Sequence, residues 1–157
     1  MVTVEQRQYA GFWRRVLAYV IDSVFLTILL VDAVLLVLVL STLGLVFFGP
    51  GYLAEREAVF QVSRAVLYFF LPYVLPPIAV ILFWVYASAT PGKMAIDARI
   101  VRADTGERPT KGQFIGRYFA YMLSGLPLGL GFLWIAFDKR KQGWHDKLAG
   151  TVVVRSS

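Results

Sequence analysis

The sequence predicts an all-α polytopic membrane protein with two full transmembrane helices and a third, broken hydrophobic segment. Apolar residues make up 58% of the 157 residues, and charged residues only 17%. The apolar residues are gathered in three blocks, each close to the roughly 20 helical residues that a bilayer core requires. So short a soluble chain would have too few polar residues to cover three such helices. We therefore expect a single membrane domain over residues 1–157.

Two blocks predict complete transmembrane helices. The first lies at about residues 13–40, where Asp22 and Asp32 are the only charges beyond Arg15. The second lies at about residues 65–88 and contains no charged residue. The polar start of the chain and the length of the first block do not fit a cleavable signal peptide, so the first span is expected to remain in the mature protein.

The third hydrophobic segment, residues 114–137, is interrupted by glycine and proline between Ser124 and Gly131. It could form a re-entrant hairpin that returns to the side it entered from, or one complete kinked span. The N-terminus, the connection at 89–113 and the tail at 138–157 are all rich in Lys and Arg, as cytoplasmic segments are. This distribution favours the hairpin, with both termini in the cytoplasm.

The cytoplasmic segments predict a small β-element. Met94–Arg102 alternates apolar and polar residues, and Gly150–Arg155 is rich in β-branched residues, so the two runs are expected to pair. Pairing requires both runs on the same side of the membrane, which again favours the hairpin. Gln142–Leu148 is expected to form a short interfacial helix, with Trp144 as an anchor.

The first span carries the most informative charges. Arg15 and Asp22 fall on nearly the same helix face, two turns or about 10 Å apart. With Arg15 at the cytoplasmic interface, Asp22 lies inside the hydrocarbon, where a carboxylate costs about 2.5–3.5 kcal/mol. Asp22 therefore needs a partner or a proton, and Arg117, Lys93 or a second subunit are the candidates. Asp32 points to another face and is expected near the outer end of the span.

Two interpretations of Arg15 and Asp22 remain open. In the first, Asp22 is a proton-binding or cation-binding carboxylate whose charge Arg15 balances. In the second, the buried charges hold the first span against the cytoplasmic segments and only specify the fold, as buried ion pairs often do.

No catalytic centre, metal site or cofactor is expected. The chain has no cysteine and a single histidine, His145, which excludes thiolate ligands and a histidine cluster. Thr90–Lys93 lacks the upstream glycine of a phosphate-binding loop, and His145 is expected to be an interfacial helix residue. The basic residues flank membrane spans, where orientation and anionic lipid account for them, so no nucleic-acid partner is expected.

Several motifs together resemble the RDD family of membrane proteins, which is named for one arginine and two aspartates. The resemblance extends from about residue 9 to residue 154, and its motifs are Gly11–Asp22, Thr90–Met94 and Leu128–Val153. By the family pattern the arginine is Arg15, with Arg14 as the alternative. The two aspartates are Asp22 and Asp146.

The resemblance implies a bacterial or archaeal inner-membrane protein. For this family, transport of unspecified ligands is proposed, with cation/proton antiport suggested for some members. The resemblance also predicts a bond between Arg15 and Asp146 at the cytoplasmic surface, which would leave Asp22 free to act or to pair with Arg117.

Two function classes follow. The first is a transporter of small ligands or cations that uses Asp22. Two or three spans rarely form a pathway alone, so this class requires a homo-oligomer or other membrane-protein subunits. The second is a non-catalytic accessory or scaffold protein that binds other membrane proteins or anionic lipid.

Overall fold

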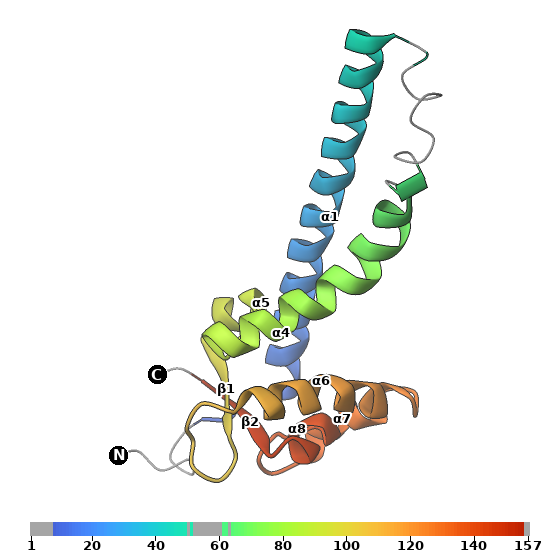
Figure 1. The fold of residues 1–157 in the computed structure, drawn as a ribbon. Coiled ribbons are helices and arrows are strands. Elements are labelled where there is room, and N and C mark those ends of the chain that lie inside the picture. The colour runs from blue at the N-terminus through green and yellow to red at the C-terminus, as the bar shows by residue number, and fades with distance from the viewer. Residues whose placement is uncertain (1–7, 50, 52–60, 63, 156–157) are drawn as a thin grey trace. The chain divides into compact units, whose positions relative to one another are not determined.

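A computed structural model describes residues 8–49, 51, 61–62 and 64–155 of the chain (Figure 1). The chain divides into two compact units: one joins Met1–Ser23 to Ala79–Ser157, and the other is Val24–Ile78. The elements in chain order are α1 (Phe12–Phe48), η2 (Val66–Val74), α4 (Leu75–Ala87), α5 (Pro91–Ala95), β1 (Ala98–Arg102), α6 (Lys111–Gly125), α7 (Leu130–Phe137), α8 (Trp144–Leu148) and β2 (Thr151–Arg155).

Two helical segments are long and apolar enough to cross a bilayer, namely Phe12–Phe48 and Tyr68–Ala87. Two such helices were predicted, but the first helix continues beyond its predicted end at residue 40. Residues 41–48 contain neither charge nor proline, so nothing in them stops the helix. It ends where Gly49 adopts a left-handed backbone with φ of 80° before Pro50.

The unit Val24–Ile78 contains the outer part of α1 and the π-helix η2. Most large apolar side chains of this part of α1 are exposed, as expected for a helix in lipid, and Asp32 is exposed as well. Pro72 lies inside η2. A proline removes a backbone donor and crowds the preceding turn, and the wider π-helical turn is a local adjustment that tolerates it.

The other unit contains a two-stranded antiparallel sheet. β1 pairs with β2, as predicted, and the register sets Ala98 opposite Arg155 and Arg102 opposite Thr151. β1 is shorter than the predicted run because Thr90 caps a short helix, α5, which takes up the first residues. The N-terminal segment continues the pairing through a bridge from Tyr9 to Val154.

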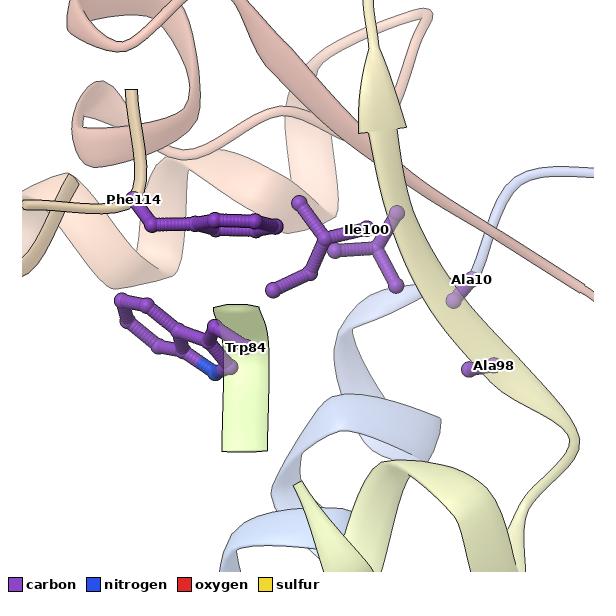
Figure 2. Packing of buried hydrophobic residues seen from close by; sticks show 6 residues of the cluster. Ala10, Trp84, Ala98, Ile100 and Phe114 are labelled. Carbon is purple, nitrogen blue, oxygen red and sulfur yellow. The ribbon is translucent and has the colours of Figure 1, made fainter. Parts of the chain in front are cut away.

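The core of this unit packs the sheet against α4 and α6. Trp84 of α4 and Phe114 of α6 lie with ring centroids 6.2 Å apart, and Ile100 of β1 completes the contact (Figure 2). The buried members of this cluster are Ala10, Trp84, Ala98, Ile100, Phe114 and Val153. Segments from both ends of the chain therefore share one hydrophobic core.

Helices α6 and α7 form a bent pair, with an angle of 99° between them. The predicted break lies between Gly125 and Leu130, where Leu128 and Gly129 both have positive φ. The two helices pack tightly beyond the bend: a β-carbon on Gly131 would lie 2.6 Å from the α-carbon of Ser124. Figure 1 shows α8 beside this pair.

Candidate charged site

Asp146 of α8 lies between two arginines from other parts of the chain. Its Oδ2 lies 2.5 Å from Nη1 of Arg15, and its Oδ1 lies 2.5 Å from Nη1 of Arg117. The predicted contact between Arg15 and Asp146 is therefore present. Arg117, which was a candidate partner of Asp22, contacts Asp146 instead. We call Arg15, Arg117 and Asp146 the charge triad.

The charge triad joins several elements because each arginine also donates to other groups. Arg15 donates from Nε to the carbonyl of Ala10 at 2.9 Å and from Nη2 to the carbonyl of Lys141 at 2.5 Å. Arg117 donates to the hydroxyl of Thr151 on β2 at 2.6 Å. The triad thus links the start of α1, helix α6, the segment before α8 and the sheet.

The electrostatics of the triad favour an ionised aspartate. Burial alone would raise the pKa of Asp146, but the guanidinium groups of Arg117 and Arg15 outweigh it and hold the pKa well below its usual value. The backbone N–H of Gly143 also donates to Oδ2 at 3.0 Å. Asp146 is fully buried, so its own chain encloses this charged carboxylate.

Asp22 makes a separate contact, with the segment that starts α5. Its Oδ2 accepts from the hydroxyl of Thr90 at 2.6 Å, and its Oδ1 accepts from the backbone N–H of Gly92 at 2.7 Å. Neither Arg117 nor Lys93 forms an ion pair with Asp22 within the described residues. We call Asp22, Thr90 and Gly92 the Asp22 contact.

Lys93 adjoins the Asp22 contact without bonding to the carboxylate. Its amine lies 3.4 Å from the hydroxyl of Thr90 and 6.0 Å from the ring centroid of Trp84. Burial lowers the pKa of Lys93, while Tyr121 and Asp22 act in the opposite direction. Lys93 is therefore an indirect neighbour of Asp22 through Thr90.

Ser124, His145 and Asp146 form a cluster that sequence reasoning missed. The Ser124 hydroxyl lies 3.2 Å from Nδ1 of His145 and accepts from its backbone N–H at 3.1 Å, while Nε2 lies 3.6 Å from Asp146. The glycine before α8 is the signal in the sequence that could have indicated this close packing. In the structure, a β-carbon on Gly143 would lie 2.6 Å from the His145 ring.

His145 lies on the short helix α8, with its ring buried between aromatic side chains. Its centroid lies 4.4 Å from that of Tyr121 and 5.1 Å from that of Phe132. Burial lowers the pKa of His145 to about 3, so the ring is neutral at ordinary pH. Ser124 is fully buried and Asp146 is held by two arginines, so the cluster lies in the packed interior of this unit.

The remaining candidates fall outside these two sites. Asp32 belongs to the other unit and is exposed. Within the described part of the chain, no group of three or more His, Cys, Asp or Glu side chains is arranged to hold a metal ion.

Comparison with known proteins identifies relatives over most of the chain. The RDD family model matches residues 9–150. The chain is 36% identical over 151 residues to "Uncharacterized protein YxaI" of Bacillus subtilis (strain 168), covering 92% of this chain and 96% of that protein. It is 45% identical over 76 residues to "Uncharacterized protein RP437" of Rickettsia prowazekii (strain Madrid E), covering 48% of this chain and 42% of the relative. No solved structure matches.

Proposed function

Because this chain belongs to the RDD family, we propose that its charged residues organise a non-catalytic membrane scaffold that binds other membrane-protein subunits. One observation carries the proposal: both aspartates of the family pattern are engaged by donors of the same chain. Asp146 is held by two guanidinium groups, and Asp22 accepts from a hydroxyl and a backbone N–H. Such buried pairs specify structure.

A carboxylate that takes part in transport has to release the hydrogen-bond donors of its own chain when it binds a ligand. For Asp146 this exchange would leave two buried guanidinium groups without a counter-charge, which is strongly unfavourable. Asp22 would have to release the Gly92 N–H, which is held in place by backbone packing against Ala18. The geometry therefore favours the interpretation in which the buried charges hold the first span against the cytoplasmic segments over the one in which Asp22 binds a proton or a cation.

We place both termini in the cytoplasm, with the α6–α7 pair as a re-entrant hairpin in a bacterial or archaeal inner membrane. The pairing of Tyr9 with Val154 supports this topology, because segments that hydrogen-bond to each other lie on the same side of a membrane. Two full spans and a hairpin satisfy that condition, whereas three full spans do not. The bend of 99° and the distribution of Lys and Arg also fit the hairpin.

Transport of a small ligand or cation by an oligomer is the second candidate. The observation that favours it is the position of Lys93, a cation with a lowered pKa beside the hydroxyl that binds Asp22. An aspartate and a lysine linked through one threonine could exchange a proton when a cation approaches.

Ion flux in proteoliposomes separates the two candidates. The wild-type chain, Asp22→Asn and the control Asp32→Asn would be compared for Na⁺, Li⁺ and H⁺ flux, with thermal stability measured on the same samples. The scaffold proposal expects no flux above that of empty vesicles and a lower stability for Asp22→Asn only. Flux that Asp22→Asn abolishes while its stability and the Asp32→Asn flux stay intact would establish transport instead.

Binding of other subunits needs its own measurement. Cross-linking in native membranes should join the wild-type chain to defined membrane proteins, and Asp146→Asn should lose these adducts as the fold loosens. A chain that stays strictly monomeric and uncross-linked in its native membrane would refute the scaffold proposal.

A further inference from the structure

A basic cavity of about 480 Å³ lies at the start of α1. Its lining includes three cationic side chains, Arg14, Lys141 and Arg155, and three aromatic ones, Tyr9, Phe12 and Trp13. The cationic residues come from the first turn of α1, the segment before α8 and the end of β2. The volume is within the range of small-ligand sites.

The three cations have no carboxylate partner in the part of the chain that the structure describes. Arg155 donates to the amide oxygen of Gln8 at 2.6 Å, and Lys141 donates to the backbone carbonyl of Ala136 at 2.9 Å. Both acceptors are neutral, and Arg14 is exposed. The cavity therefore holds uncompensated positive charge and is complementary to an anion.

The surroundings of the cavity indicate the source of that anion. Trp13 is 78% exposed and contacts Phe12 edge to face, with centroids 5.3 Å apart, at the point where the apolar helix α1 begins. Exposed tryptophan at the end of a transmembrane helix is typical of the headgroup level of a bilayer. An anion at this level belongs to a phospholipid.

We propose that this cavity binds the phosphate headgroup of an anionic phospholipid. Arg14, Lys141 and Arg155 contact the phosphate, Trp13 lies at the glycerol level, and the acyl chains follow the exposed apolar side chains of α1, such as Leu17 and Val20. The three cationic side chains of the site are not members of the charge triad, although Arg15 donates to the backbone carbonyl of Lys141, and the proposal does not depend on the scaffold function.

Native mass spectrometry of the full chain in detergent tests the proposal. Bound phosphatidylglycerol would be compared with phosphatidylcholine of the same acyl chains. The pocket variant is Arg14→Gln, Lys141→Gln and Arg155→Gln, and the matched control removes the same charge from exposed cations elsewhere, Arg99→Gln, Arg108→Gln and Lys111→Gln. We expect the wild type to prefer phosphatidylglycerol, the pocket variant to lose about tenfold or more of that preference, and the control to keep it.

Several results would overturn the proposal. They are an equal uptake of both lipids by the wild type, an equal loss in the pocket and control variants, and competition by millimolar inorganic phosphate, which would indicate a free-phosphate site. Arg14→Gln alone changes an exposed side chain and serves as a second variant if the triple substitution unfolds. It should lower the preference on its own, and an unchanged preference would count against the site.

Discussion

Gly92 lies so close to Ala18 that a β-carbon on Gly92 would fall 2.0 Å from the carbonyl oxygen of Ala18. The same approach brings the Gly92 N–H to 2.7 Å from Oδ1 of Asp22. Backbone packing and the hydrogen bond to the carboxylate are therefore two results of one contact between α1 and the start of α5.

Gly92→Ala should be strongly destabilising. The added methyl group meets rigid backbone, so α5 has to move away from α1 and the hydrogen bond to Asp22 is lost. We expect a loss of about 3 kcal/mol in the free energy of unfolding, measured by denaturation in detergent. Gly116→Ala is the matched control, since nothing lies within 4 Å of its β-carbon position on α6. It should be neutral or gain up to about 1 kcal/mol, and equal effects of the two substitutions would contradict the contact.

Asp146→Asn should cost more stability than Arg15→Gln. Removing the aspartate charge leaves the buried Arg117 and the partly buried Arg15 together without a counter-charge, at a cost of about 3–5 kcal/mol. After Arg15→Gln, Arg117 still neutralises Asp146, so we expect only about 1–3 kcal/mol. The charge-swapped pair Arg15→Asp with Asp146→Arg should not restore stability, because the new arginine faces Arg117. Full rescue by the swap would show that Arg117 is not part of the triad.

Thr90→Val should destabilise the protein by about 1–3 kcal/mol, because its nearly isosteric side chain cannot donate to Asp22. Thr90→Ser retains the hydroxyl and should behave as the wild type within about 0.5 kcal/mol. Denaturation curves of the two variants under the same conditions provide the comparison. If serine were as damaging as valine, the hydroxyl would not be the group that matters.

The single histidine predicts a pH dependence of stability. Burial lowers the pKa of His145 from 6.5 to about 3. The unfolded chain therefore takes up a proton below pH 6.5 that the folded chain does not, so the stability contributed by neutral His145 is present above pH 6.5 and is lost as the pH falls towards 3. The slope is about 1.4 kcal/mol per pH unit. Unfolding midpoints between pH 7 and 5 should fall for the wild type and stay nearly level for His145→Gln, and a persistent slope in the variant would assign it to other groups.

The features that could be predicted from the sequence depend on a local residue pattern or on the position of one charge, Arg15, at the membrane interface. Long apolar blocks predicted the two spans, and an alternating run together with a β-branched run predicted the sheet. The contact of Arg15 with Asp146 followed from placing Arg15 at the interface by hydropathy and from the resemblance that singled out Asp146. Each of these inferences needs only one segment, or two segments on the same side of the membrane.

The features that could not be predicted depend on how helices cross. Arg117 faces Asp146 because α6 lies across α8, and hydropathy does not determine that arrangement. The Thr90–Lys93 turn was recognisable as the end of a span, but its N–H reaches Asp22 only through the close approach at Gly92. The enclosure of the His145 ring by Tyr121 and Phe132 was not predicted, because it depends on how α6 and α7 pack against α8.

The pairing of Tyr9 and Ala10 with β2 has a consequence for biosynthesis. The backbone N–H of Ala10 donates to the carbonyl of Val153, so the N-terminal segment can complete its contacts only after β2 has left the ribosome. Contacts of such wide sequence separation form late in folding. Helix α1 therefore enters the bilayer before Asp146 has been synthesised, and Arg15 gains its counter-charge only after α8 has been made. A chain truncated before β2 should insert its spans but fail to form the sheet, which makes β2 a natural checkpoint for quality control.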